Sequence, residues 1–388
     1  GRSEPLNVNW NYPTQVLVGA GRLQELPGLC VQHGMQNPLL VTDPGLASLP
    51  MVAEALVLCR AAGLSVGCFS QIKPNPTGAN IKDGIAAFQA GQHDGVIAMG
   101  GGSGLDAGKA IAVLAQQTCS LWDLEDIGDQ WQRADVSRIM PLIALPTTAG
   151  TGSEVGRAAL VVNEAQQRKV IIFHPKMMPA AVILDPILTL GLPAGLTAAT
   201  GMDALSHSLE AYCSNYYHPM AEGIAMQGMR LVKDYLPAVV RDGTDVEARQ
   251  QMLVASTMGA TAFQRGLGAM HALAHPLGAI FDAHHGMLNA ILMPYVLKAN
   301  YPVIKQRIGL LAQCLELEPD FEGFMSWILA LRAEINIPHT LASTIDADSL
   351  PDTIGAMAVA DPSAGSNPIS FSAPQYRQIL LAALNGEL

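Results

Sequence analysis

The pattern of hydrophobic and polar positions changes near the middle of the chain. In the first half, short aliphatic runs alternate with longer amphipathic stretches, as in "PLLVTD" (38–43), "MVAEALVLCRAAG" (51–63) and "DGVIAMGGG" (94–102). This alternation predicts βαβ units and a parallel sheet. Further strand-like runs continue to "AAVILDP" (180–186), where we expect the sheet domain to end.

The second half has a helical pattern. From "PAGLTAATGMDALSHSLEAY" (193–212) onward, segments rich in Ala, Leu and Met show helical spacing and are separated by Pro and Gly. We expect an α/β dinucleotide-binding domain with a Rossmann-like parallel sheet over residues 1–186 and an all-α domain over residues 187–388. The ligand site is expected in the crevice between the two halves.

Composition narrows the class of protein. Apolar residues make up 49% and charged residues 14% of the 388 positions, which is typical of a compact, well-buried enzyme. A net charge of −11 and the lack of a basic patch argue against nucleic acid as a partner. No apolar run reaches the roughly 18 residues of a membrane span. The six dispersed cysteines and the lack of an apolar signal-peptide core predict a cytoplasmic protein.

A glycine-rich turn follows one predicted strand, in "VIAMGGGSGLDAGKA" (96–110). Glycines between a strand and a helix let backbone N–H groups approach a pyrophosphate at the helix N-terminus. Asp43 ends an earlier strand, where a carboxylate suits the adenosine ribose and favours NAD over NADP. The alternative is a tight turn in which Asp43 only caps a strand end.

Two neighbouring patterns are weaker. A P-loop is not supported, because Ser103 stands where that motif needs glycine and Ala110 where it needs Ser or Thr. The turn-rich "PTTAGTGSE" (146–154) follows another strand and offers several hydroxyl groups to a ligand. Alone, this segment would be interpreted as an ordinary Ser/Thr-rich loop.

Aspartate and histidine recur at helical spacing in the second half, as Asp203 with His207 and then His271 with His275, followed by the adjacent His284 and His285. A helical Asp/His pair by itself is more often a hydrogen-bonded surface couple. Taken together, the groups predict a metal site, with structural or solvent-facing histidines as the alternative. Nitrogen and oxygen ligands without cysteine suit Fe(II), Zn²⁺, Ni²⁺ or Mn²⁺ without choosing among them.

Several motifs in order carry a family resemblance: "GGGSGLDAGKA", "PTTAGTGSE", "GMDALSHSLEAY" and "HALAHPLGAIFDAHHGMLNAILMPYVLKAN". Together they resemble the iron-containing (group III) alcohol dehydrogenases of the dehydroquinate synthase-like superfamily, over nearly the whole chain. The resemblance implies an N-terminal α/β NAD-binding domain and a C-terminal helical domain. It also implies NAD and a divalent metal as cofactors, with Fe(II) expected and Zn²⁺ as the alternative.

Site residues follow from the resemblance position by position. The metal ligands are expected to be Asp203, His207, His271 and His285. His275 matches a histidine near the nicotinamide and substrate, so it is the expected catalytic residue, whereas His284 stands where Pro is usual in the family. The residues implied for NAD binding are Asp43, Gly101, Gly102, Ser103, Asp106, Thr147, Thr148, Thr151 and Lys169.

These observations predict an NAD- and metal-dependent alcohol dehydrogenase that interconverts a small primary alcohol and its aldehyde. The metal polarises the substrate oxygen while hydride moves to the nicotinamide. The alternatives are a relative acting on a polyol or polyol phosphate, a dehydroquinate synthase-like lyase, or a non-catalytic nucleotide- or metal-binding protein. An anionic substrate needs a basic pocket, and no Lys/Arg cluster accompanies the histidines. We expect a homodimer or higher homo-oligomer.

Overall fold

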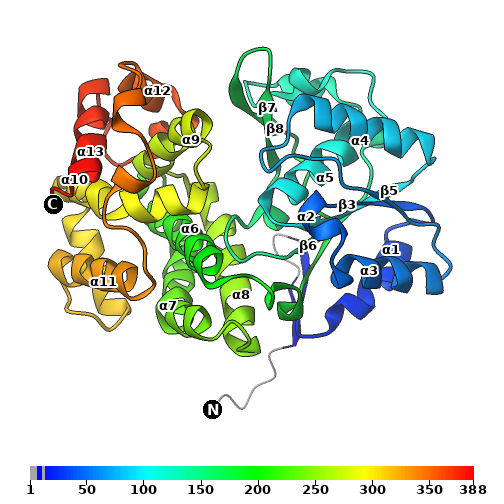
Figure 1. The fold of residues 1–388 in the computed structure, drawn as a ribbon, viewed down its shortest axis with the longest axis horizontal. Helices are drawn as coiled ribbons and strands as arrows, with labels where there is room; N and C mark the ends of the chain where they lie inside the picture. The colour runs from blue at the N-terminus through cyan, green and yellow to red at the C-terminus, as the bar shows by residue number, and fades with distance from the viewer. Residues whose placement is uncertain (1–6, 11–13) are drawn as a thin grey trace. The chain divides into compact units, whose positions relative to one another are not determined.

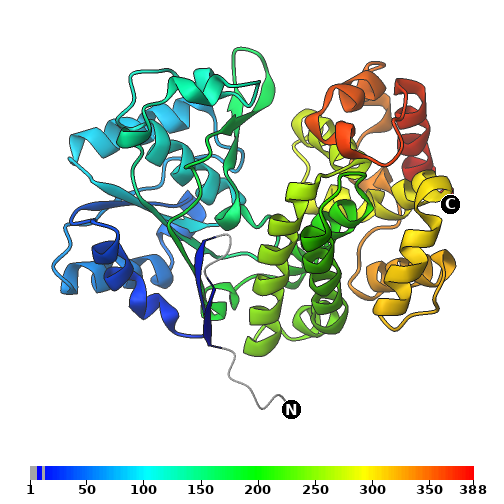
Figure 2. The same cartoon turned by 180° about the vertical axis from the view of Figure 1, so that it is seen from behind.

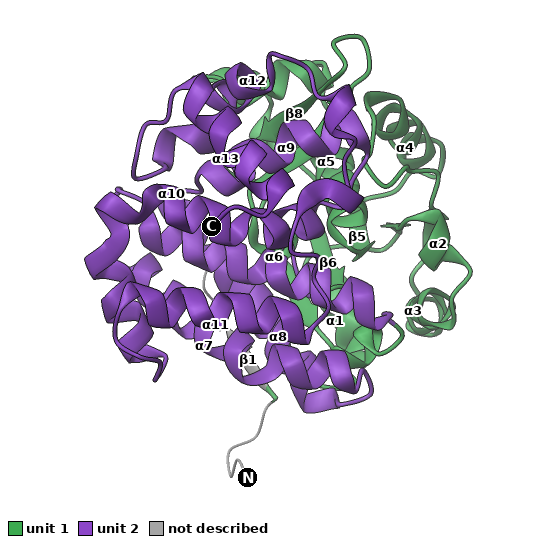
Figure 3. Cartoon of the chain, turned by 60° about the vertical axis from the view of Figure 1, so that its left-hand side comes forward, with its two compact units in different colours: residues 1–148, 152–191 green, residues 149–151, 192–388 purple. Residues whose placement is uncertain are grey.

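The computed structural model describes residues 7–10 and 14–388, which divide into two compact units (Figure 3). The first unit contains residues 1–148 and 152–191, and the second contains residues 149–151 and 192–388. Each unit has its own architecture, α/β in the first and helical in the second.

Strands and helices alternate in the first unit (Figure 1). Its strands are β1 (Val8–Trp10), β2 (Gln15–Val18), β3 (Pro38–Val41), β4 (Gly67–Phe69), β5 (Gly95–Gly100), β6 (Leu142–Pro146), β7 (Ala158–Asn163), β8 (Arg168–Phe173) and β9 (Ala181–Leu184). Its α-helices are α1 (Leu26–Gln32), α2 (Pro44–Ala47), α3 (Pro50–Ala61), α4 (Gly78–Ala90) and α5 (Gly102–Leu114).

Seven of the described strands form one sheet in the order β1-β2-β9-β6-β5-β3-β4. Figure 2 shows the chain from behind. All neighbouring pairs are parallel except β1 with β2. From β3 the chain crosses first to β4 on one side and then to β5 on the other. The order therefore reverses between β3 and β5, and α/β sheets bind ligands at the carboxyl ends of such strands.

The central strand β5 is buried along its whole length, as expected for a strand covered on both faces. Ile97 and Met99 pack in one core cluster with residues of α1 and α3, including Leu26 and Val52. On the opposite face α5 packs on β5. A β-carbon at Gly108 would lie 2.5 Å from that of Ala98, so glycine permits this close packing.

Two of the strand-like runs in the first half do not join the parallel sheet. The runs at 158–164 and 169–173 are strands, but β7 and β8 pair antiparallel with each other in a separate two-stranded sheet. Burial alternates along both strands, with Val161 and Val170 buried and their immediate neighbours half-buried. This alternation is typical of a two-stranded ribbon with one solvated face and not of a strand inside a parallel sheet.

The second unit is helical. Its α-helices are α6 (Ala194–Cys213), α7 (Pro219–Arg241), α8 (Val246–Ala262), α9 (Ala269–Phe281), α10 (His285–Cys314), α11 (Phe321–Glu334), α12 (Ile354–Ala360) and α13 (Ala373–Asn385). Helix α6 packs against α7, α8 and α10, and from Thr197 to Cys213 every residue is buried. A helix with apolar or small residues around most of its circumference is expected in the core of a protein. Because buried polar groups need hydrogen-bond partners, the polar residues of α6 are expected to have them.

The parallel sheet followed by a helical region confirms the predicted fold class. None of the helices in the described part of the chain is both long and apolar enough to cross a membrane.

Candidate functional site

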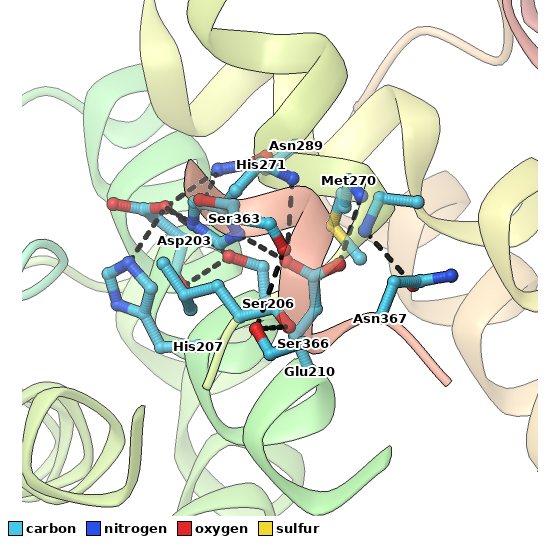
Figure 4. Close-up of polar contacts among 12 residues, drawn as sticks. Asp203, Ser206, His207, Glu210, Met270, His271, Asn289, Ser363, Ser366 and Asn367 are labelled. Carbon is cyan, nitrogen blue, oxygen red and sulfur yellow. Dashed lines mark hydrogen bonds and ion pairs between the residues drawn. The ribbon is translucent and has the colours of Figure 1, made fainter. Parts of the chain in front are cut away.

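Three helices, α6, α9 and α10, bring four candidate ligands together in the second unit. Figure 4 shows three of the four, Asp203, His207 and His271. Asp203 and His207 lie one turn apart on α6, and His271 lies in the first turn of α9. His285 is the first residue of α10. One oxygen or nitrogen atom of each residue lies within 4.8 Å of those of the other three.

Asp203 is the hub of this cluster. Its Oδ1 lies 3.2 Å from Nε2 of His285, 3.7 Å from Nε2 of His207 and 3.9 Å from Nε2 of His271. Two ligand atoms that each lie about 2.0–2.2 Å from one ion are separated from each other by distances similar to these three. The three imidazoles therefore direct the same ring nitrogen toward one carboxylate oxygen.

Two imidazoles and the carboxylate of the cluster have the protonation states that a cation requires. Burial lowers the pKa of His207 to about 4, and it also lowers the pKa of His271, so both imidazoles stay neutral. Burial opposes ionisation of Asp203, but the neighbouring His285 and His207 hold its pKa well below the ordinary value. Neutral imidazoles and an ionised carboxylate are the ligand forms that bind divalent metals. The residues present therefore fit a divalent ion.

The adjacent histidines separate into two roles. The side chain of His284 caps α10, because its Nδ1 accepts a hydrogen bond from the N–H of Met287 at 3.3 Å. His285 directs its Nε2 into the cluster instead. The structure thus brings His285, and not His284, together with the other three candidate ligands.

A fully buried amide touches the same atoms. Nδ2 of Asn289 lies 3.0 Å from Oδ1 of Asp203, 3.1 Å from Nε2 of His285 and 3.3 Å from Nε2 of His271. Because Asn289 follows His285 by four residues, both side chains lie on one face of α10. Its amide orients the central carboxylate of the cluster.

A second carboxylate lies behind His271. Glu210, also on α6, contacts Nδ1 of His271 and accepts the backbone N–H groups of Met270 and His271 at 2.9 and 3.4 Å. Burial raises the pKa of Glu210 to about 7, although those backbone N–H groups act in the opposite direction. The other ring nitrogen, Nε2, is the one that faces Asp203.

The expected catalytic histidine lies beside the cluster. The ring of His275 stacks on that of His285, with centroids 5.7 Å apart, and its Nδ1 lies 2.9 Å from Oδ2 of Asp361. Burial opposes ionisation of Asp361, but hydrogen bonds from His275 and Ser363 hold its pKa below the ordinary value. With Nδ1 bonded to a carboxylate, His275 keeps Nε2 for proton exchange.

The glycine-rich turn forms in the first unit as predicted, between β5 and α5. Gly100 has a φ of +156°, a conformation that favours glycine, and Gly101 and Gly102 begin the helix. Asp43 follows β3 and caps α2, accepting the N–H of Leu46 at 3.0 Å. A β-carbon at Gly100 would lie 3.6 Å from Oδ2 of Asp43, so this carboxylate lies beside the turn.

The carboxylate of Asp106 is engaged by the protein. It accepts the hydroxyl of Ser153 at 2.6 Å and the N–H of Leu160 at 3.1 Å. Lys109, 1% exposed, lies 3.6 Å from Asp106 and donates to the carbonyls of Ser153 and Ala158 at 2.9 and 2.5 Å. These contacts fasten residues 153–160 to α5.

The remaining predicted cofactor residues fall on different elements. Thr147 and Thr148 follow β6, where the N–H of Thr147 donates to the carbonyl of Gly100 at 2.9 Å. The hydroxyl of Ser103 donates to the carbonyl of Pro74. Thr151 belongs to the second unit, and Lys169 lies on β8 opposite Val162.

Three polar residues of the site were not predicted from the sequence: Glu210, Asn289 and Asp361. Glu210 follows His207 by three residues and Asn289 follows His285 by four, so helical spacing from a predicted ligand could have identified both. No local pattern identifies Asp361, which is 86 residues from His275.

Comparison with known proteins decides the family. Residues 13–186 match the family described as iron-containing alcohol dehydrogenase, and residues 197–384 match the C-terminal region of the same family. The chain belongs to the iron-containing alcohol dehydrogenase family. This confirms three predictions from the sequence: the family resemblance, the enzyme class and a divalent metal as the family's cofactor.

Three relatives illustrate the match. A 4-hydroxybutyrate dehydrogenase from Cupriavidus necator is 36% identical, over 95% of this chain and 98% of the relative. An NAD-dependent methanol dehydrogenase from Bacillus methanolicus is 34% identical, over 79% of this chain and 80% of the relative. The crystal structure of a 1,3-propanediol oxidoreductase has a TM-score of 0.88 at 32% identity, covering 97% and 99% of the two chains.

Proposed function

We propose that this iron-containing alcohol dehydrogenase interconverts small primary alcohols and their aldehydes with NAD as the hydride acceptor, and that Asp203, His207, His271 and His285 hold its metal. The observation that carries the proposal is the buried cluster in which three imidazole Nε2 atoms converge on one carboxylate oxygen. When bound there, a divalent ion supplies Lewis-acid polarisation of the substrate oxygen, and bound NAD accepts the hydride.

The names of the relatives support the substrate class. 4-Hydroxybutyrate, methanol and 1,3-propanediol all carry a primary hydroxyl group, and one relative is named for NAD. Within the described residues, the contacts of the cluster involve carboxylates, imidazoles, an amide and the hydroxyl of Ser206 but neither Lys nor Arg. This supports an alcohol that carries no charge near its hydroxyl group over a polyol phosphate or the anionic substrate of a dehydroquinate synthase-like lyase, and the carboxylate of 4-hydroxybutyrate lies at the opposite end of that molecule from its hydroxyl group.

We propose that His275 is the residue that exchanges the proton of the alcohol hydroxyl group. Asp361 holds Nδ1 of this imidazole, so Nε2 can accept the hydroxyl proton of the alcohol and return it in the reverse direction. Because His275 lies outside the four-residue cluster, its removal should interrupt proton exchange without removing a metal ligand.

For NAD, we propose the glycine-rich turn with Asp43 at the ribose, the role predicted from the sequence. The turn follows β5, and the strand order of the sheet reverses between β3 and β5, where such sheets bind ligands. This position supports the proposed NAD site. Ser103, Thr147, Thr148 and Thr151 are proposed hydroxyl donors, and direct contacts of NAD with Asp106 and Lys169 stay predictions. The division into an NAD-binding domain (1–186) and a catalytic domain (187–388), the homo-oligomer and the cytoplasmic location also stay predictions.

The test is NADH formation from a panel of primary alcohols by protein loaded with Fe(II) or Zn²⁺, with NADH oxidation by the matching aldehydes. His275→Ala should retain its metal while turnover falls by about 100-fold or more, the range of general acid–base catalysis. An inactive wild type with every alcohol and metal would overturn the dehydrogenase proposal. An active His275→Ala variant would overturn only the role of His275.

A further inference from the structure

Glu210 is a buried carboxylate that the reaction itself does not use. Its side chain is 5% exposed, and its oxygens contact the first turn of α9, at the N–H groups of Met270 and His271 and at Nδ1 of His271 (Figure 4). A β-carbon at Gly268 would lie 2.6 Å from Oε2, so glycine at this position leaves room for the carboxylate. Glu210 is thus built into the start of the helix that carries one candidate ligand.

The spacing on α6 links Glu210 to the metal cluster. Asp203, His207 and Glu210 occupy positions i, i+4 and i+7, which lie on one face of a helix. The first two direct an oxygen and a nitrogen into the cluster. The third, Glu210, contacts the imidazole of His271, the cluster member on α9.

We propose that Glu210 is a positioning residue of the metal site, acting on His271. It holds His271 so that Nδ1 faces the carboxylate and Nε2 faces Asp203. The inference rests on the proposed function, in which Asp203, His207, His271 and His285 hold the ion.

The chemistry of imidazole gives the reason. A neutral ring has one N–H donor and one lone pair, and a metal takes the lone pair. A carboxylate at Nδ1 accepts its N–H, which leaves the lone pair on Nε2 and fixes the orientation of the ring. Nε2 of His271 lies 3.9 Å from Oδ1 of Asp203, on the side of the ring that faces the cluster.

Helix capping is the alternative role for Glu210, because its oxygens accept two of the free N–H groups that begin α9. The chain offers a matched control for this role. Oδ1 of Asn367 accepts the N–H of Ala269 in the same turn, at 3.0 Å, and the contacts described for Asn367 do not include an imidazole. Replacing Asn367 removes a cap while the bond to His271 stays.

The experiment compares Glu210→Gln with Asn367→Ala in the full chain after removal of metal. Binding of Zn²⁺ is measured by competition with a chromophoric chelator, and Co²⁺ is added for its visible absorption spectrum. Glu210→Gln should bind Zn²⁺ about 10–100-fold more weakly, as is typical when the carboxylate behind a histidine ligand is lost, and should change the Co²⁺ spectrum. Asn367→Ala should keep the affinity and spectrum of the wild type.

Wild-type affinity and spectrum in Glu210→Gln would overturn the proposal, as would an equal loss in Asn367→Ala. A measurement without substitution covers the case in which a variant does not fold. In Zn²⁺-loaded wild type labelled with ¹⁵N-histidine, His271 should carry its proton on Nδ1. A proton on Nε2 of that residue would overturn the proposal.

His271→Ala in the same titration separates this inference from the proposed function. If that variant binds Zn²⁺ like the wild type, the proposed metal site itself is wrong. If His271→Ala loses the metal and Glu210→Gln keeps it, only the role of Glu210 is wrong.

Discussion

The candidate sites of the two units are built by different means. In the first unit the glycine-rich turn presents backbone groups, and its glycines at 100–102 are consecutive in the sequence. In the second unit the cluster consists of side chains from α6, α9 and α10, from positions as distant as Asp203 and His285. A backbone site depends on local conformation, whereas a side-chain site depends on how separate helices pack.

The difference also appears in what surrounds each site. The cluster in the second unit has an outer layer of polar side chains, among them Glu210 behind His271 and Asn289 beside Asp203. At the turn in the first unit the N–H of Thr147 donates to the carbonyl of Gly100, and the helix that follows packs closely on β5 at Gly108 and Ala98. Substitutions should therefore affect the two sites through different quantities, metal affinity in one and stability or nucleotide selectivity in the other.

The largest effect is expected from separating the adjacent histidines at the start of α10. His285→Ala removes a proposed ligand and should lower Zn²⁺ affinity by more than about 100-fold, beyond the range for outer-layer residues. His284→Ala removes only the helix cap, which should cost about 1 kcal/mol of unfolding free energy. Chelator competition and thermal unfolding measure the two effects. Equal metal affinities in the two variants would contradict the assignment.

The sequence was sufficient for the parts of each site that repeat a short local pattern. The glycine turn follows an apolar strand, and helical spacing joins Asp203 to His207. Each of these patterns lies within a few residues, so local geometry decides which groups meet.

Contacts that depend on tertiary packing could not be predicted in the same way. Asp361 contacts His275 although 86 residues separate them in the sequence. The β-branched residues of β7 and β8 predict strands, but they do not predict that the two strands pair with each other outside the parallel sheet. Lys109 and Asp106 provide a third example. Their spacing of three residues on α5 is visible, but their partners at 153–160 lie on another element.

The next effect concerns the stability of the first unit. Lys109→Met retains the length of the side chain but removes the cation beside Asp106 and the donor to two carbonyls. Breaking a buried pair from one side should destabilise the protein by about 3 kcal/mol, measured by urea unfolding. Lys82→Met, at an exposed position of α4, is the matched control, with an effect within about 0.5 kcal/mol. A loss of Zn²⁺ affinity in folded Lys109→Met would show that the two sites are not independent.

The smallest effect should be a change of nucleotide preference. Asp43→Asn removes the charge beside the glycine turn but keeps a side-chain oxygen that can cap α2, since Asn and Asp are equally good caps. Losing the repulsion of a 2′-phosphate should raise the NADP/NAD ratio of kcat/KM about 10-fold, equivalent to about 1.4 kcal/mol. Asp94→Asn is the control, because the carboxylate of Asp94 accepts the N–H groups of Gln36 and Asn37. This variant should leave the ratio unchanged. If Asp43→Asn also leaves it unchanged, Asp43 acts only as the cap of α2, and cofactor selection in the first unit must come from other residues.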